Sequence, residues 1–170
     1  MKELLNKLIR LKIQYLQMLL KFHMEQTNSS KKIYEMAKSL LGDRVAPYDK
    51  RSAYGTLGCA MTVSIIIKRA TGYPIGGDGF IEGTPELYTC LLNDSHFIKV
   101  DKPLPGDIRL GVTGTGNGRL SNAHAGIDGY HGVMSNNSNN GRLQQKISFD
   151  EWKRIYEDFG GYETFYFRML

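Results

Sequence analysis

The sequence holds few of the residues that build metal sites or disulfide frameworks. Its 170 residues include two cysteines, Cys59 and Cys90, and four histidines. The cysteines lie 31 positions apart and form no CxxC pair, whereas a zinc site needs four ligands at recognisable spacing. One disulfide is possible, but a scaffold held together by several disulfides is excluded. We therefore expect two free thiols and neither a metal nor another cofactor.

Long apolar runs are also absent. In residues 1–22, lysines and Arg10 interrupt every apolar stretch, whereas a transmembrane helix needs about 20 consecutive apolar residues. The same segment lacks the small-residue cleavage site of a secretory signal peptide. Hydrophobic residues nevertheless make up 41% of the chain and charged residues 23%, which is typical of a globular protein with its own core.

The positive charge is concentrated at the N-terminus. The formal net charge is +5, and residues 1–22 contribute +4 of it through five basic residues and Glu3. A nucleic-acid-binding domain usually carries its excess charge as a basic patch on the folded body. We therefore expect no nucleic-acid partner.

The same N-terminal segment has the pattern of an amphipathic helix. Apolar residues recur at alternating intervals of four and three, as in a short heptad seam: Leu4, Leu8, Leu11, Tyr15, Met18 and Phe22. We predict a basic amphipathic helix over residues 1–27. The pattern is compatible with packing on its own domain, with a helix–helix contact to a partner, with an atypical signal anchor, or with peripheral membrane contact through residues 1–22.

The rest of the chain changes from helical to strand-like patterns near residue 97. Apolar spacing and capping residues predict helices at about 30–41, 59–70 and 84–93, and a capping box at 148–151 opens a helix around Trp152 and Tyr156. Strands are predicted at about 97–100, 107–112, 123–129, 132–137 and 162–169. The glycine-rich run 113–118 lacks the lysine of a nucleotide-binding loop and is interpreted as a hairpin loop. Helices followed by strands indicate an α+β domain.

Cys59 is the candidate nucleophile, although a lone cysteine at a helix start is more often a small buried hydrophobe. It follows Gly58 at the beginning of a predicted helix. Unpaired backbone amides and the helix dipole at such a position favour an anion, so we expect the pKa of the thiol to be lowered. The same amides could stabilise the oxyanion of a tetrahedral intermediate.

His124 is the candidate base, and an asparagine is the candidate partner for its ring. His124 lies in the small-residue stretch NAHAGI, and Asn136 follows twelve positions later. If these segments form paired strands, an asparagine amide oxygen can accept a hydrogen bond from the imidazole and fix its tautomer. Side chains alternate along a strand, so only one of Asn136 and the neighbouring Asn137 shares the face of His124.

The order of these segments resembles the NlpC-like peptidase superfamily, which includes the CHAP branch of cysteine- and histidine-dependent amidohydrolases and peptidases. The matching segments are GCA at 58–60, PLPGDI at 103–108, HAGI at 124–127 and MSN at 134–136, within residues 28–170. PGDI followed by HAGI is the most specific part; we expect Asp107 itself to bond to backbone amides of its turn. Where family members usually have DCSG around the nucleophile, this chain has GCAM.

The resemblance implies a papain-like α+β architecture for residues 28–170, in which a nucleophile-bearing helix packs on an antiparallel sheet of about five strands. Carried over by position, Cys59 is the nucleophile, His124 the general base and acid, and Asn136 the orienting residue. The implied reaction is hydrolysis of amide bonds in the peptidoglycan peptide stem, or between stem and sugar.

Two alternatives remain open at this point. The same triad could serve another acyl transfer, as in a toxin-type amidase or an acyltransferase, or the domain could be a non-catalytic module that binds the wall or a partner. A wall hydrolase acts in the periplasm or outside the cell. Because no cleavable signal peptide is evident, we expect phage-type release or a non-standard export route. The bond cut, the oligomeric state and a phage or cellular origin stay open.

Overall fold

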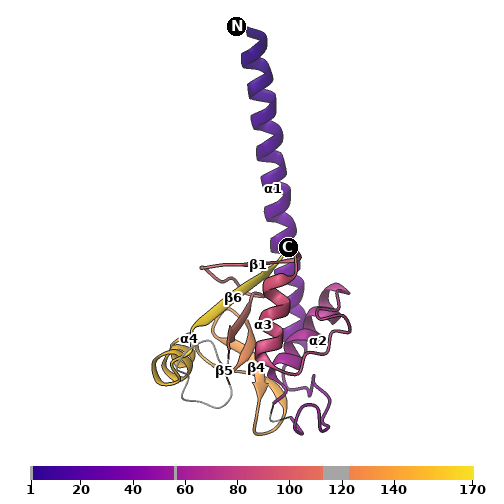
Figure 1. The fold of residues 1–170 in the computed structure, drawn as a ribbon, viewed down its shortest axis with the longest axis vertical. Coiled ribbons are helices and arrows are strands. Elements are labelled where there is room, and N and C mark those ends of the chain that lie inside the picture. Colours follow the sequence, from indigo (N-terminus) through magenta and orange to yellow (C-terminus); the bar gives the residue numbers. More distant parts are fainter. Residues whose placement is uncertain (1, 56, 113–122) are drawn as a thin grey trace.

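Helices come first in the chain and strands follow. The computed structural model describes residues 2–55, 57–112 and 123–170, without the side chains of residues 2–6 and 15–27. The elements in order are α1 (Lys2–Ser39), α2 (Cys59–Thr71), α3 (Thr84–Asn93), β1 (Phe97–Lys99), β2 (Ile108–Gly111), β3 (Ala125–Asp128), β4 (Val133–Asn137), β5 (Arg142–Ile147), α4 (Phe149–Trp152), the π-helix η1 (Lys153–Phe159) and β6 (Thr164–Met169) (Figure 1). The predicted α+β class is confirmed. The predicted glycine-rich loop lies outside the described residues.

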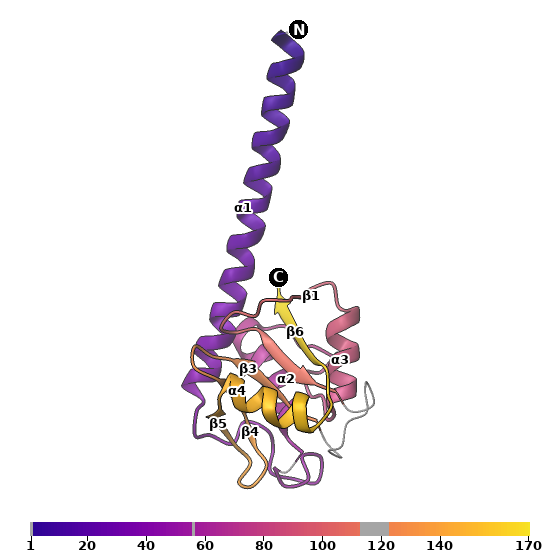
Figure 2. The same cartoon turned by 90° about the vertical axis from the view of Figure 1, so that its left-hand side faces the viewer.

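The described strands form one antiparallel sheet of six strands in the order β1-β6-β2-β3-β4-β5. Helix α2 covers one face, and α4 with η1 lies across the other (Figure 2). The sequence predicts all of these strands except β5. Its RLQQKI stretch buries only Leu143, so it lacks the apolar alternation by which a strand is identified.

Helix α1 is continuous where the sequence predicts two separate helices. Residues 22–30 contain neither glycine nor proline, so nothing in the backbone chemistry interrupts the helix there. The last turns of α1 bury Ser30, Ile33 and Ala37 in the body of the protein. The N-terminal part projects away from that body (Figures 1 and 2). The helix therefore crosses the predicted boundary after residue 27 without a break.

Helix α2 is the central element of the core. Ala60, Val63, Ile66 and Ile67 are almost fully buried in the apolar core that the sheet also enters. Burying each large aliphatic side chain contributes roughly 1.5 to 3 kcal/mol, and this packing outweighs the modest strand preference of the β-branched run 65–67. The helix ends at Gly72 in a left-handed conformation, as a glycine C-cap allows.

The PGD turn at residues 105–107 connects α1 to the sheet by hydrogen bonds. Asp107 is fully buried and accepts hydrogen bonds from the Leu104 amide (2.7 Å), from Ser30 Oγ (3.0 Å) and from Arg168 Nη2 (2.6 Å). The Leu104 bond confirms the prediction that Asp107 bonds within its turn. Gly106 packs so closely that a Cβ atom built on it would collide with the Ser30 carbonyl. The turn therefore joins α1, β2 and β6.

A pair of glycine substitutions tests this close contact. Gly106 and Gly42 both have φ of +95°, but nothing lies within 4 Å of a Cβ built on Gly42. We expect Gly42→Ala to lose about 1 kcal/mol of unfolding free energy through backbone strain alone. Gly106→Ala should lose about 3 kcal/mol more because of the collision. Urea unfolding followed by circular dichroism measures both, and equal losses would show that the contact is not tight.

Candidate active site

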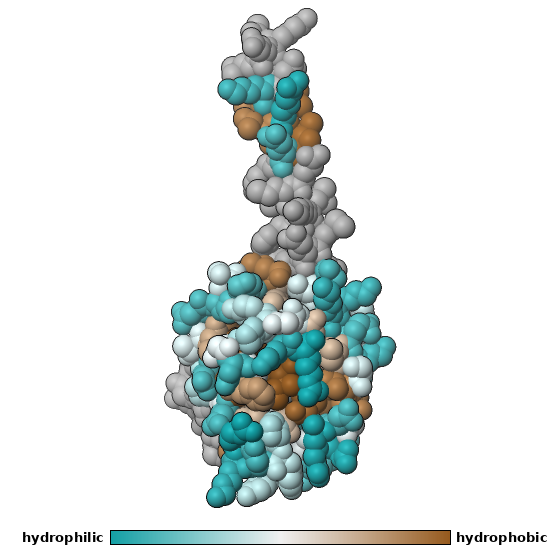
Figure 3. Space-filling view, turned by 90° about the vertical axis from the view of Figure 1, so that its right-hand side faces the viewer, coloured by the Kyte–Doolittle hydropathy of each residue, from teal (hydrophilic) through white to brown (hydrophobic). Residues whose placement is uncertain are grey.

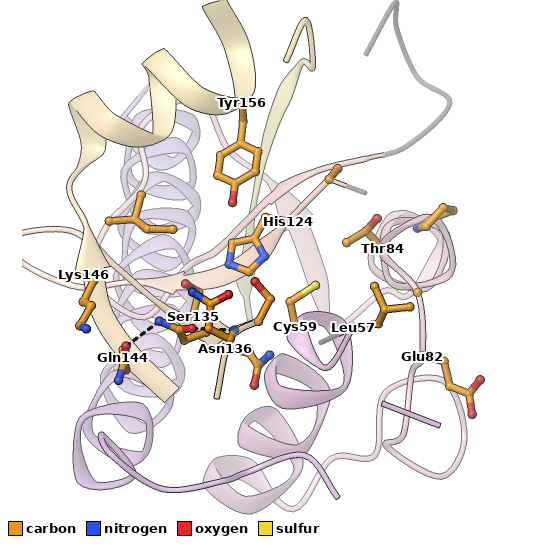
Figure 4. A pocket seen from close by; sticks show the side chains of 17 residues that line it. Leu57, Cys59, Glu82, Thr84, His124, Ser135, Asn136, Gln144, Lys146 and Tyr156 are labelled. Carbon is orange, nitrogen blue, oxygen red and sulfur yellow. Dashed lines mark hydrogen bonds between the residues drawn. The ribbon is translucent and has the colours of Figure 1, made fainter. Parts of the chain in front are cut away.

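A pocket of about 460 Å³ opens where α2 and α3 begin. Its lining includes the three predicted site residues Cys59, His124 and Asn136, together with Asn137 and Tyr156 (Figure 4). These side chains come from the first residue of α2, the residue before β3, the end of β4, and η1. The fold thus brings together residues that are far apart in the sequence.

Cys59 is a free, partly buried thiol at the first position of α2. Burial raises the pKa of this thiol, although the backbone amides of Ala125, Ala60 and Cys59 itself act in the opposite direction. The prediction of a lowered pKa was therefore wrong in direction. The thiolate loses more solvation in the pocket than the amides at the helix start return. Cys90 is also a free thiol, as expected.

His124 sits directly before β3, and its backbone is tied to the sheet because its carbonyl accepts a hydrogen bond from the Gly111 amide (2.9 Å). Figure 4 shows its ring and the Cys59 side chain at the same pocket, which both residues line. Burial lowers the pKa of His124 to about 4. The imidazole is therefore neutral at pH 7 and able to accept a proton from a thiol.

Asn136 is buried against the loop that leads into α2. Its Nδ2 donates to the Gly55 carbonyl (2.7 Å), and its Oδ1 is buried without a hydrogen-bond partner among the described atoms. A Cβ built on Gly58 would lie 3.4 Å from that Nδ2. The described hydrogen bonds include none between Asn136 and His124, so the role of Asn136 as orienting residue stays a prediction.

The register of β3 and β4 bears on the choice between the two asparagines. Gly126 pairs with Ser135, and continuing the antiparallel pairing puts His124 opposite Asn137, on the same face of the sheet. Asn137 Nδ2, however, donates to Gln144 Oε1 (2.8 Å) on β5. Both asparagines line the pocket. The amide of each one already donates a hydrogen bond to a neighbouring residue.

Tyr156 also lines the pocket, and the sequence does not predict its position beside His124. Its ring stacks on the His124 imidazole, with centroids 5.5 Å apart and planes at 15°. Burial, together with the nearby Cys59, raises the pKa of Tyr156 to about 12. The capping box at Ser148 and Glu151 locates its helix in the sequence, but which strand end that helix covers depends on the order of strands in the sheet.

The depressed pKa of His124 makes stability depend on pH. The folded state holds this ring neutral down to about pH 4, whereas the unfolded chain protonates it near pH 6.5. The unfolded chain therefore binds more protons below pH 6.5, and stability falls as the pH drops through that range. We expect wild type to lose about 1 to 2 kcal/mol more than His124→Gln between pH 7.5 and pH 5.

Urea unfolding of both proteins at the two pH values measures this difference. Comparing the two proteins cancels the contribution of other groups, such as Asp128, whose pKa burial raises to about 6. Identical losses in wild type and His124→Gln would contradict an imidazole that the folded protein keeps neutral.

No other chemistry is evident from clusters or from relatives. Among the side chains that the structure describes, no three histidine, cysteine or acidic groups lie close enough together to hold a metal ion. Comparison of the chain with protein-family models, curated proteins and solved structures gave no match. The geometry of the pocket is therefore the basis from which a function is inferred.

Proposed function

We propose that the protein is a cysteine amidase or peptidase that hydrolyses amide bonds in the peptide stem of peptidoglycan. The observation that supports it most is that the Cys59 thiol and the neutral His124 imidazole line one open pocket. The packing of α2 against an antiparallel sheet also supports a papain-like architecture. Nucleophilic catalysis needs a thiol, a base within reach and room for the substrate; a thiol and an imidazole that line one pocket of about 460 Å³ support this reading.

The reaction begins with both groups neutral. His124 takes the thiol proton as the Cys59 sulfur attacks the carbonyl carbon of the amide, and the backbone amides at the start of α2 stabilise the resulting oxyanion. His124 then protonates the leaving nitrogen, the C–N bond breaks, and an acyl-enzyme thioester remains. Water, deprotonated by His124, attacks the thioester and releases the acid and the free thiol.

One side of the pocket has side chains that can bind a peptide or glycan substrate. Polar, uncharged side chains line one side: Ser135, Asn136, Asn137, Asn139 and Gln144. Such groups hydrogen-bond amides and hydroxyls, whereas an acyl chain needs an apolar groove. These polar side chains support the peptidoglycan proposal, while the rest of the lining includes apolar residues: Leu57, Pro85, Ala123 and Ile147. A toxin-type amidase using the same pair would fit the same pocket.

We propose that the projecting part of α1 binds the surface of an anionic membrane. Leu8, Ile9, Leu11 and Ile13 are each about half exposed, and Figure 3 shows apolar and hydrophilic side chains side by side there. A two-stranded coiled coil would cover the seam of Leu8 and Leu11 but not Ile9 and Ile13. No described helix is long and apolar enough to cross a membrane.

The charge of this segment supports the same partner. Residues 4–24 contain no aspartate or glutamate, while Lys7, Arg10 and Lys12 lie among the exposed apolar side chains. Two such basic helices would repel each other in a dimer, whereas anionic lipid attracts them by about 1 kcal/mol per basic residue. Long basic side chains can also keep their charges in the headgroup layer while the apolar ones enter the membrane.

Digestion of isolated cell-wall sacculi tests the proposed reaction. Wild type should release soluble muropeptides with new amine termini. Cys59→Ala should release none, and His124→Ala should be at least about 100-fold slower because the general base is lost. Cys90→Ala is the matched control and should retain wild-type activity, since Cys90 lies outside the pocket. Equal release by wild type and Cys59→Ala would refute the mechanism, and no release by the wild type would leave a non-catalytic binding module.

Vesicle sedimentation tests the membrane proposal. The protein should bind vesicles of phosphatidylglycerol and phosphatidylcholine and should be released by added salt. The variant Lys7→Gln/Arg10→Gln/Lys12→Gln should bind at least about tenfold more weakly, whereas Lys31→Gln/Lys32→Gln, nearer the body of the protein, should bind as wild type does. Salt-independent binding, or dimers in solution without vesicle binding, would contradict the proposal.

A further inference from the structure

Two aromatic rings lie beside the imidazole of the candidate base. The His124 imidazole lies 5.5 Å from the Tyr156 ring and 6.0 Å from the Trp152 ring, with interplanar angles of 15° and 30°. Tyr156 and Trp152 also contact each other, with ring centroids 4.5 Å apart. The imidazole is therefore packed against two flat side chains from the C-terminal helical segment.

Trp152, the second of the two rings, is fixed to the sheet. Trp152 is fully buried, and its indole Nε1 donates to Thr164 Oγ1 (2.9 Å) on β6. The Arg109 guanidinium lies 5.7 Å from the Trp152 ring, and a bidentate bond to Asp128 fixes that guanidinium in turn. Because the Trp152 ring is held on several sides, the Tyr156 ring packed against it has little freedom to move. Tyr156 in turn limits the rotation of the His124 ring.

Tyr156 is presented to His124 from a π-helical turn. Tyr156 lies within η1, and its carbonyl accepts a hydrogen bond from the Tyr162 amide (2.9 Å) after the helix ends. π-helical turns are rare and occur often at functional sites, where the wider turn changes the direction of a side chain. The Tyr156 ring accordingly faces the pocket, as Figure 4 shows.

Among the described residues, the contacts that fix the plane of the imidazole are these ring contacts, since none donates to or accepts from its ring nitrogens. A general base must be held close to its working geometry, because small displacements cost large factors in rate. We infer that Tyr156 is a positioning residue that holds the His124 imidazole toward the Cys59 sulfur through the face of its ring. This inference rests on the proposed function.

The ring, and not the hydroxyl, is the part of Tyr156 to which this role is assigned. Two substitutions separate them, because Tyr156→Phe keeps the ring and removes the hydroxyl, and Tyr156→Leu removes the ring. Tyr156→Met, with a flexible side chain of similar reach, is a second ring-free variant that tolerates irregular packing. Phe159→Leu is the matched control, because Phe159 is exposed on the same π-helix and outside the pocket.

Proton NMR of His124 is the first measurement, because the stacked rings shift the signals of the imidazole protons. Tyr156→Phe and Phe159→Leu should keep the wild-type shifts. Tyr156→Leu and Tyr156→Met should lose them, and the pKa of His124 should rise from about 4 toward the ordinary value as water reaches the ring. This measurement needs no substrate, so it tests the positioning even if the protein does not cleave peptidoglycan.

Sacculus digestion is the second measurement. The ring-free variants should lose at least about tenfold in kcat with KM nearly unchanged, and Tyr156→Phe should stay within about threefold of wild type. Two results would overturn the inference. One is a ring-free variant whose His124 signals and kcat equal those of Phe159→Leu. The other is a Tyr156→Phe protein as impaired as Tyr156→Leu, which would assign the role to the hydroxyl.

Discussion

The contact between the first turn of α2 and the start of β3 is the constraint on which the site depends. The Cys59 sulfur faces the backbone amide of Ala125, which influences its pKa, and Ala125 directly follows His124 in the chain. Ala125 supplies a small, fully buried residue on the β3 side, and Gly58, before α2, packs closely on Ala46 and Asn136. The buried turn at Asp107 also helps to place the start of β3. It fixes where β2 begins, and β3 pairs with β2.

Burial of the pair determines how the chemistry can start. Amides at a helix N-terminus favour a thiolate by up to about 2 kcal/mol in buried geometries, whereas full desolvation can shift a pKa by several units. Here desolvation prevails for both groups, since it raises the pKa of Cys59 and lowers the pKa of His124. Both shifts leave the resting groups uncharged. The thiol is then activated when the substrate carbonyl arrives and the proton moves to His124, with no ion pair formed beforehand.

The sequence predicts much of the fold because most elements carry their own signals. Helix α3 begins at Thr84-Pro85, and β3 and β4 show the short apolar runs of buried strands. The signals fail where tertiary structure decides. Polar β5 is a strand because β4 offers an edge, and α1 passes through Asn28 and Ser29 without stopping there. The candidate site follows the same division. Cys59 and His124 are predicted from their motifs and the family resemblance, whereas the Tyr156 contact and the raised thiol pKa depend on which surfaces meet.

The position of Asn136 shows why ring packing can matter more than a hydrogen bond in this pocket. Its Nδ2 faces the Gly55 carbonyl, and turning the amide round would set two oxygens against each other, so Oδ1 is fixed as a buried acceptor without a partner. Leaving such a group unpaired costs about 1 to 3 kcal/mol. That cost is tolerable if the amide also holds the loop before Cys59 in place. Asn136 would then position the nucleophile from one side of the pocket while the Tyr156 ring positions the base from the other, so the two reacting groups are held independently.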